Sequence, residues 1–308
     1  MENSNRRKNS ILVVGSSNTD MMIKTERLPR PGETVIGGSF FMSPGGKGAN
    51  QAVAIARLGG QIAFICKTGS DVFGLQSHQL FEEEGFDTSY IFSDTKNPSG
   101  VALIIVDENA ENSIVVASGA NANLLPENLL KAESAIDDAE FILMQLEIPI
   151  ETVEFVADTA YKKNKKVILN PAPAQKLSKE LLQTLYMITP NETEAEMISG
   201  IKITDEQSIV EVAKKISGMG VDNVIITLGA KGAFVYSDNI CEIVPSVKVK
   251  ALDTTAAGDI FNGALIVALA ENRTLIESVR FACKASAISV TRIGAQSSAP
   301  YRNEVDIF

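Results

Sequence analysis

The segment Asp253-Thr254-Thr255-Ala256-Ala257-Gly258-Asp259 follows an extended run, 247–252, and leads into an apolar stretch that predicts a helix from about Ile260 to Ala270. It is a loop of small residues at the N-terminus of a helix. Free backbone N–H groups at such an end, together with the helix dipole, attract anions, and small side chains let a phosphate approach the backbone closely. The segment therefore predicts a phosphate-binding turn between an extended segment and a helix.

Asp259 closes this loop and puts a carboxylate beside the predicted anion site. That placement suits a reaction in which a proton is taken from an attacking hydroxyl, next to a phosphoryl group whose charge the loop stabilises. The alternative is that Asp259 is a favourable first-turn carboxylate and Asp253 a loop cap. The loop alone does not decide between these readings.

Apolar, β-rich runs alternate with helical patterns along most of the chain. Strands are predicted at 11–14, 63–67, 141–146, 167–170, 187–189 and 224–228, and helices at 49–58, 73–84, 126–136, 150–162 and 207–217. This alternation predicts an α/β fold with a Rossmann-like, mostly parallel sheet and helices on both faces. Ligands of such sheets bind at the carboxyl ends of the strands.

Two segments without a helical pattern interrupt this alternation. Residues 21–41 hold two extended runs around Leu28-Pro29-Arg30-Pro31-Gly32, and residues 101–118 are typical of a hairpin. We expect a small β-sheet lid here, because the apolar residues of these runs need a covering surface; ordinary surface hairpins are the alternative. The predicted division is an α/β core of residues 9–17, 42–100 and 119–308, and a lid of residues 18–41 and 101–118.

A second glycine-rich motif, Pro44-Gly45-Gly46-Lys47-Gly48-Ala49-Asn50, begins the predicted helix 49–58. It is not a Walker A loop, because Gly48 follows Lys47 where Ser or Thr is required. Its glycines bring the backbone close to a ligand, and Lys47 and Asn50 share a face of the first helical turn. The motif suits contacts with sugar hydroxyls, although a plain glycine-rich turn fits it as well.

Polar residues also stand where predicted strands end. Asn18 and Asp20 follow the strand 11–14, Glu147 follows 141–146, and Asn191 and Glu194 follow 187–189. Each alone is typical of a turn or cap, but their shared position at one edge of a sheet indicates a site. Another strand ends in Thr227-Leu228-Gly229-Ala230-Lys231-Gly232, which fits a nucleotide-binding loop and a hairpin turn equally.

The composition limits the possible partners and chemistry. A formal net charge of −10 over 308 residues disfavours binding to nucleic acid or to a membrane surface. The basic run Arg6-Arg7-Lys8 lies in a polar tail, and the apolar run after it is too short for a signal peptide or a membrane span, so we expect a cytoplasmic protein. With one histidine, His78, an enzyme of this sequence would use a carboxylate base. We expect reduced, buried thiols at the three widely spaced cysteines, Cys66, Cys241 and Cys283.

Taken together, the motifs resemble those of the ribokinase family, the carbohydrate and nucleoside kinases that include bacterial minor phosphofructokinase. The resemblance covers the chain from Ile11 to Ile307. Its most specific parts are the segment 253–259 with Phe261-Asn262-Gly263-Ala264, and Gly45-Gly46-Lys47-Gly48-Ala49-Asn50-Gln51. Shorter matches are Gln145-Leu146-Glu147, Asn170-Pro171-Ala172-Pro173, Thr189-Pro190-Asn191-Glu192 and Thr291-Arg292-Ile293-Gly294-Ala295.

The resemblance implies a reaction and an assembly. The reaction is transfer of the γ-phosphoryl group of MgATP to O5 of D-ribose, which gives ribose 5-phosphate, under a β lid through which two subunits often form a homodimer. Asp259 would be the base, and the backbone of Ala256, Ala257 and Gly258 the anion hole. The positions that match the family's sugar contacts are Asn18, Thr19, Asp20, Gly45, Gly46, Lys47, Gly48, Asn50 and Glu147.

The same resemblance implies sites for the nucleotide and for two metal ions. The nucleotide positions are Asn191, Thr227, Leu228, Gly229, Ala230, Lys231, Gly232, Gly258 and Cys283, and Glu194 lies where the family orders Mg²⁺ through water. The family is activated by a monovalent cation, usually K⁺, and the matching positions are Asp253, Thr255, Ser289, Arg292, Gly294 and Ser298. Oxygen ligands suit such a weakly bound hard cation.

Two positions depart from the family pattern. Ile260 stands where a small hydroxyl residue is usual, and Cys283 replaces a larger polar residue near the adenine, so we expect altered nucleotide affinity or selectivity. The alternatives for function are a related kinase for deoxyribose, fructose or adenosine, and a catalytically silent, sugar-responsive regulator. The contacts expected from Asp20, Asn50 and Glu147 favour a small free sugar, and the carboxylate of Asp259 beside an anion hole argues against a silent regulator.

Overall fold

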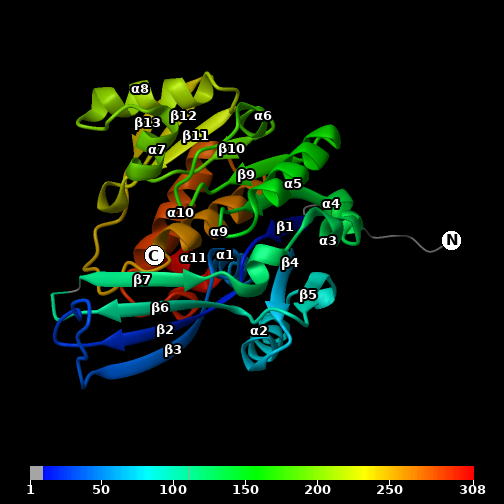
Figure 1. The fold of residues 1–308 in the computed structure, drawn as a ribbon. Coiled ribbons are helices and arrows are strands. Elements are labelled where there is room, and N and C mark those ends of the chain that lie inside the picture. Colours follow the sequence, from blue (N-terminus) through cyan, green and yellow to red (C-terminus); the bar gives the residue numbers. More distant parts are fainter. Residues whose placement is uncertain (1–9, 110) are drawn as a thin grey trace.

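The computed structural model describes residues 10–109 and 111–308, so the tail with Arg6-Arg7-Lys8 and the predicted first core residue, Asn9, lie outside the described residues. Figure 1 shows a large twisted sheet between layers of helices. Its nine strands are, in spatial order, β13 (Ile240–Val244), β12 (Ala233–Ser237), β11 (Asn223–Thr227), β10 (Met187–Ile188), β9 (Lys166–Leu169), β8 (Ala139–Met144), β1 (Ser10–Val14), β4 (Ile62–Gly69) and β5 (Ile91–Asp94).

The sheet is parallel from β11 to β5, and only the β11–β12 and β12–β13 pairs are antiparallel. Side chains of β1 alternate between two apolar cores. Ile11 and Val13 belong to the core on one face, and Leu12 and Val14 to the core on the other. A strand that is buried on both faces needs a continuous apolar run, which explains its sequence. The predicted α/β class with a mostly parallel sheet is confirmed.

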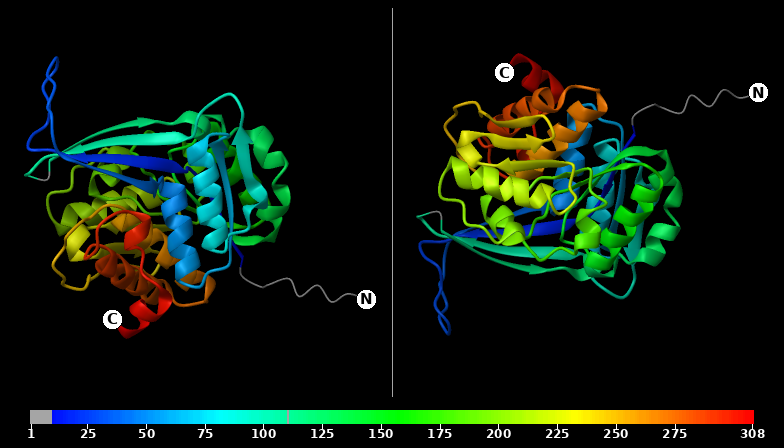
Figure 2. Two further views of the ribbon diagram at one scale, coloured as in Figure 1. Left: turned by 90° about the horizontal axis from the view of Figure 1, so that it is seen from below. Right: turned by 90° about the horizontal axis from the view of Figure 1, so that it is seen from above.

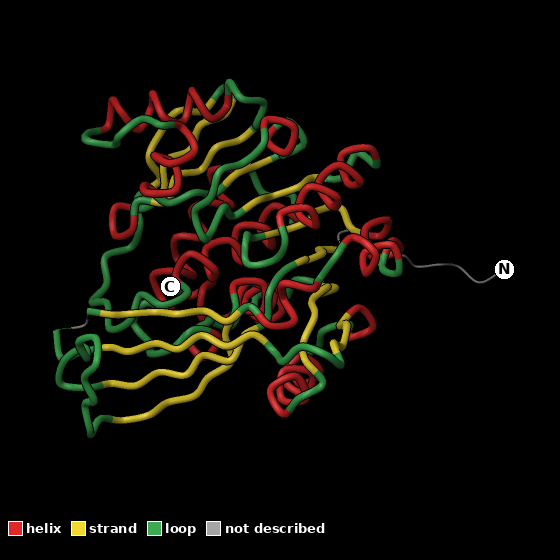
Figure 3. Tube along the Cα trace, in the orientation of Figure 1, coloured by secondary structure: helices red, strands yellow, loops and turns green. Residues whose placement is uncertain are grey.

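Helices cover both faces of the sheet (Figure 3). One core is covered by α1 (Lys47–Arg57), α2 (Val72–Glu83), α9 (Ala257–Ala270), α10 (Leu275–Ser289) and α11 (Arg302–Ile307). The other is covered by α3 (Pro126–Leu130), α4 (Glu133–Asp138), α5 (Ile150–Lys162), α6 (Lys179–Leu182), α7 (Glu192–Ser199) and α8 (Glu206–Ser217). The helix α9 is apolar all round, since it packs between the sheet, α1 and α10.

Two predictions about local structure were wrong, the continuous helix 126–136 and the burial of all three thiols, and the run 247–252, predicted only as extended, forms no strand. The predicted helix 126–136 is two short helices, because the N–H groups of Lys131 and Ala132 bond three residues back and tighten the turn between α3 and α4. The run 247–252 pairs with no strand; at its end the N–H groups of Leu252 and Asp253 bond to the carbonyl of Val290, after α10. Cys241 is exposed, whereas Cys66 and Cys283 are buried, and all three thiols are free.

A second sheet of four strands stands beside the main one. Its order is β3 (Ser39–Gly45), β2 (Asn18–Lys24), β6 (Gly100–Val106) and β7 (Asn112–Ala117), with β2 and β6 parallel and the other pairs antiparallel. These strands lie side by side in Figure 1, and the segment between β2 and β3 extends away from the rest in Figure 2. The predicted hairpin at 101–118 is present; its turn includes Ala110, which lies outside the described residues. None of the described helices is long and apolar enough to cross a bilayer.

Candidate active site

The site begins where two glycine-rich turns bring α1 against the end of β1. Gly46, with φ of 87°, directly precedes α1, and a Cβ there would lie 2.7 Å from the backbone nitrogen of Asn18. A Cβ on Gly48 would lie 2.5 Å from the backbone nitrogen of Ser16. Since no real Cβ tolerates such distances, only glycine allows this approach. The approach brings Lys47 and Asn50 beside the polar residues that follow β1.

Asp259 lies in the first turn of α9 and is only 5% exposed. Both of its carboxylate oxygens accept a hydrogen bond from an amide side chain of α1. Asn50 Nδ2 donates to Oδ2 at 2.9 Å, and Gln51 Nε2 donates to Oδ1 at 2.9 Å. Burial raises the pKa of Asp259, while the charge of Lys47 and the two amide bonds act in the opposite direction. A buried carboxylate with a raised pKa is typical of a general base.

The N-terminus of α9 has the geometry of an anion hole. Ala256, just before the helix, is left-handed with φ of 58°, and within the described part of the chain the backbone N–H groups of Gly258 and Asp259 have no acceptor. A Cβ on Gly258 would meet no atom within 4 Å, so the space in front of this turn is open. Asn262 fixes the turn, because its amide donates to the carbonyl of Gly258 at 2.8 Å. These donors and the helix dipole suit a phosphate group.

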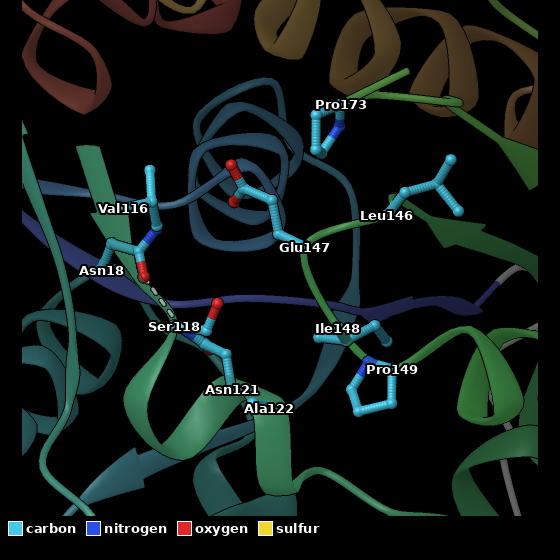
Figure 4. A pocket seen from close by; sticks show the side chains of 10 residues that line it. All are labelled: Asn18, Val116, Ser118, Asn121, Ala122, Leu146, Glu147, Ile148, Pro149 and Pro173. Atoms are coloured by element: carbon cyan, nitrogen blue, oxygen red, sulfur yellow. Dashed lines mark hydrogen bonds between the residues drawn. The ribbon is translucent and has the colours of Figure 1, made fainter. Parts of the chain in front are cut away.

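A cavity of about 330 Å³ lies between the second sheet and the end of β8. Figure 4 shows the Glu147 side chain extending into the space between Val116 and Pro173. The amide of Asn121 donates to Asn18 Oδ1 at 2.8 Å, and Asn18 Nδ2 has no acceptor among the described residues. The complete lining is Asn18, Val116, Ser118, Asn121, Ala122, Leu146, Glu147, Ile148, Pro149 and Pro173. Polar groups on an apolar wall are typical of a small-molecule site.

Four carboxylates, Asp20, Glu147, Glu194 and Asp259, act electrostatically on Lys47, and Glu147 also lines this cavity. Glu147 Oε2 accepts from Ser16 Oγ at 2.6 Å and from the backbone nitrogen of Lys47 at 2.9 Å. Burial, helped by the charges of Glu147 and Asp259, raises the pKa of Asp20 to about 6. The charge of Asp259 is in turn the main reason that the pKa of Lys47 is raised. The cluster supplies acceptors for hydroxyl groups around one cation.

Two adjoining cavities, of about 110 and 460 Å³, lie on the other side of the α9 N-terminus. Gly229 and Ala257 line both. Of the predicted nucleotide residues, the cavities are lined by Thr227, Gly229, Ala230, Gly232, Gly258 and Cys283. Leu228 and Lys231 belong to the turn between these residues, where the N–H of Leu228 donates to the carbonyl of Gly232. Burial raises the pKa of the Cys283 thiol to about 11, so this side chain is a neutral part of the wall.

Asn191 and Glu194 form a capping box at the start of α7. The backbone nitrogen of Glu194 donates to Asn191 Oδ1 at 2.8 Å, and that of Asn191 donates to Glu194 Oε2 at 2.9 Å. A bridge between Asn191 and Thr227 joins this helix start to the nucleotide-side cavities. Burial raises the pKa of Glu194, and the remaining carboxylate oxygen, Oε1, has no bond within the described residues.

The predicted cation residues lie where the 253–255 loop meets the turn after α10. Asp253 connects the loop to the turn, because its carboxylate oxygens accept hydrogen bonds from the backbone nitrogens of Thr255 at 2.9 Å and Gly294 at 2.8 Å. The side chains of the other three bond elsewhere: Ser289 to the carbonyl of Ser286, Ser298 to that of Ala295, and Arg292 to Glu304. These three therefore offer backbone carbonyls. A set of oxygen donors with the single carboxylate of Asp253 is of the kind that suits a weakly bound hard cation.

Several buried amides at this site had no role predicted from the sequence, apart from Asn170, which was one of the polar residues expected where strands end. Gln51, Asn121, Gln145, Asn170 and Asn262 are all buried and hydrogen-bond to site residues or to one another. Four of them stand inside the motifs quoted above. The motifs therefore indicated that these amides lie near the site, although the sequence pattern did not predict which amide contacts which carboxylate.

The raised pKa of Asp20 predicts a pH-dependent cost to stability. Its folded-state value of about 6 exceeds the ordinary 3.8, so the folded protein binds this proton more tightly than the unfolded chain does. The loss of unfolding free energy that comes from ionising Asp20 in the folded protein is absent below pH 4 and complete above pH 6. We expect Asp20→Asn to raise the free energy of unfolding of the ligand-free protein by about 1–2 kcal/mol at pH 7.5 and by almost nothing at pH 4, measured by urea unfolding.

Asp71→Asn is the matched control for this substitution. Its carboxylate caps α2 and its pKa is lowered by hydrogen bonds, so the same change there should cost stability at pH 7.5. A gain from Asp20→Asn that is equal at both pH values would contradict the electrostatic explanation.

Comparison with known proteins agrees with this geometry. Residues 8–302 match the pfkB family of carbohydrate kinases. The ribokinase of Haemophilus influenzae is 47% identical over 297 residues, 96% of this chain and 97% of that protein, and the deoxyribokinase of Salmonella typhi is 35% identical over 94% of this chain and 95% of that protein. The structure of Arabidopsis thaliana ribokinase complexed with ribose and ATP has a TM-score of 0.90 at 31% identity, covering 97% of this chain and 98% of that one. With this fold, this site and these relatives, the chain belongs to the pfkB family of carbohydrate kinases.

Proposed function

We propose that the protein transfers the γ-phosphoryl group of ATP to O5 of D-ribose, giving ribose 5-phosphate and ADP. One observation carries the proposal. Asp259 is buried in the first turn of α9, where its pKa responds to the charge of Glu147, which lines one cavity, and its neighbour Gly258 lines the cavity on the opposite side of the turn. A base between a hydroxyl site and a phosphate site is the arrangement that phosphoryl transfer to an alcohol requires.

The residues divide the reaction between them. Asn18, Asp20, Lys47, Asn50 and Glu147 hold the sugar hydroxyls and aim O5 at the γ-phosphorus. Asp259 takes the proton of this hydroxyl, O5 forms the new bond to phosphorus, and the bond to the β-phosphate oxygen breaks as ADP leaves. The free N–H groups at the start of α9 stabilise the charge on the transferring group. The second sheet is the lid that keeps water from the phosphoryl group.

Mg²⁺ and the nucleotide fit the opposite side of the turn. Residues Thr227 to Gly232 and Cys283 provide the walls of the nucleotide site. Glu194 would hold Mg²⁺ through water, since one of its oxygens is already used in the capping box and the described residues offer no cage of carboxylates. A Mg²⁺ ion held there would neutralise part of the phosphate charge.

A second candidate remains for the sugar that accepts the phosphoryl group. A deoxyribokinase is among the relatives, so phosphorylation of 2-deoxyribose is the second candidate. The acceptors around Lys47 favour the sugar with more hydroxyl groups, because a missing hydroxyl leaves buried polar groups without a partner.

Steady-state ADP release should show that D-ribose is preferred over 2-deoxy-D-ribose, D-fructose and adenosine. We expect kcat/KM for 2-deoxy-D-ribose to be lower than for D-ribose by about 10- to 100-fold, which is the cost of one unpaired buried polar group. NMR of the product should place the phosphate on O5. A higher kcat/KM for any competitor would transfer the proposal to that substrate, and no turnover on the whole panel would favour a sugar-responsive regulator.

We also propose that K⁺ binds between the loop 253–255 and the turn after α10 and supports activity. The loop leads directly into the anion hole, so a cation bound there orders the N-terminus of α9. Replacing KCl by tetramethylammonium chloride at equal ionic strength should lower kcat/KM by about 5-fold or more, a usual size for coupling between sites. Equal rates in the two salts would remove the cation from the mechanism.

We further propose that two copies associate through their lids. Both faces of the lid sheet are apolar and exposed. In the strand register Met42, Met21, Leu103 and Val115 stand in one row, and Phe41, Met22, Ile104 and Ile114 form the next row on the opposite face. An isolated sheet cannot cover two such faces, and a second lid of identical composition is the partner that matches them.

Light scattering should therefore give twice the chain mass of 33.0 kDa at micromolar concentration. The double variant Phe40→Asp/Leu103→Asp should be monomeric, because it buries charge in the proposed interface. Tyr161→Asp, on the equally exposed surface of α5, is the control and should remain dimeric. A monomeric unsubstituted protein, or a dimer that survives the double substitution, would contradict the lid interface.

A further inference from the structure

A chain of buried amides extends from the base into the protein. Gln51, on α1, is completely buried; its Nε2 donates to Asp259 Oδ1 at 2.9 Å and to Asn170 Oδ1 at 3.1 Å. Its Oε1 accepts from Nε2 of Gln145, which is also completely buried. We propose that Gln51, oriented by Gln145, is a positioning residue that fixes one oxygen of the Asp259 carboxylate and so leaves the other for the substrate hydroxyl. The inference rests on the proposed role of Asp259 as base.

The direction of each amide follows from the carboxylate. An ionised carboxylate only accepts hydrogen bonds, so Gln51 must turn its NH₂ group toward Asp259. Its carbonyl oxygen then faces Gln145, which must present an NH₂ group in turn. The remaining oxygen of Gln145 has no partner among the described residues. The unpaired buried atom is therefore Gln145 Oε1, at the end of the row of amides that is farthest from Asp259, while the hydrogen bond from Gln51 to Asp259 is retained.

Packing removes other orientations of these side chains. On α9, a Cβ at Gly263 would lie 2.6 Å from Ala54 Cβ and 3.0 Å from the carbonyl oxygen of Gln51, so α1 and α9 are in close contact at this point. A Cβ at Gly15 would lie 2.2 Å from Gln145 Oε1. Side chains at these two positions would collide with the amides or with α1, so glycine on both sides is what makes room for this amide chain.

The second amide on the carboxylate, Asn50, is placed differently. It donates to Asp259 Oδ2, but its own Oδ1 is buried without a partner among the described residues. Asn50 is also part of the proposed sugar site, so a hydroxyl group can satisfy this oxygen. We therefore infer that the hydrogen bond from Asn50 to Asp259 can be exchanged for one to the substrate, whereas the hydrogen bond from Gln51 to Asp259 is kept throughout the reaction.

The charged groups around the base define what losing Gln51 should do. Lys47 lowers the pKa of Asp259, whereas Glu147 raises it, and the charges of Asp20 and Glu194 are coupled to the same carboxylate. The amide bonds favour the ionised form. Without Gln51 the carboxylate should therefore titrate at higher pH while all four charged neighbours stay in place.

The test is the pH profile of kcat for Gln51→Leu. We expect its acid limb to move up by about one pH unit, with kcat reduced about tenfold on the acid side of the limb and less than about threefold on the plateau above it. KM for D-ribose should change less than about threefold, because Gln51 does not contact the sugar. Gln145→Leu should move the limb in the same direction by less, and the double variant should match Gln51→Leu alone.

Two controls separate positioning from packing. Gln79→Leu makes the same change on the exposed surface of α2 and should leave the profile unchanged. In an Asp259→Asn background, Gln51→Leu should cause no further loss of rate. A loss that is equal at all pH values, or one that persists in that background, would overturn the proposal.

A measurement without substrate keeps this inference distinct from the proposed function. The ¹³C resonance of the Asp259 carboxyl, assigned by its disappearance in Asp259→Asn, should titrate at higher pH in Gln51→Leu than in the unsubstituted protein. This shift is expected even if ribose proves to be the wrong substrate. An unchanged titration in a folded Gln51→Leu protein would overturn the positioning role.

Discussion

The burial of one carboxylate is the constraint on which the rest of the structure depends. Asp259 lies in the first turn of a helix that is apolar on every side, and a charge in such surroundings is tolerated only with hydrogen bonds and a nearby cation. Asn50 and Gln51 supply the bonds, and Lys47 supplies the charge. All three come from one turn and a half of α1, so the contact between α1 and α9 also forms the surroundings of the proposed base.

The same contact explains why glycine stands at particular positions. Gly46 and Gly48 let α1 approach the end of β1, and Gly263 lets α9 approach α1. The result is a buried group of acids, Asp20, Glu147 and Asp259, in which burial, helped by the charges of the neighbouring carboxylates, raises the pKa values of Asp20 and Asp259. This arrangement costs stability in the empty site, and a ligand with hydroxyl donors relieves it. The site therefore shows the conflict between stability and function that is expected of a preorganised enzyme.

Much of the fold could be predicted from the sequence because its strands are buried on both faces. The run Ile11 to Val14 is continuous and apolar for that reason, and α5 was predicted with the bounds that it has in the structure. Predictions failed where local and tertiary preferences differ. The turn between α3 and α4 depends on two local hydrogen bonds that periodicity does not report.

For the site, the sequence identified the chemistry better than the geometry. Polar residues at strand ends and two small-residue loops indicated where ligands bind, since the topology of a parallel sheet brings such ends together. The partners of Asp259 could not be predicted in the same way. Gln51 and Gln145 are 94 positions apart, and amides carry no charge pattern that would have linked them.

The central claim, that Asp259 is the base, is tested most directly by Asp259→Asn with two measurements on one preparation. If the carboxylate removes the proton from the attacking hydroxyl, kcat should fall on the order of 10²–10⁴-fold. D-ribose binding, measured by calorimetry, should weaken only slightly, because the amide keeps the size of the side chain. Near-normal turnover with intact binding would contradict the account and leave Asp259 as a structural carboxylate at a helix N-terminus.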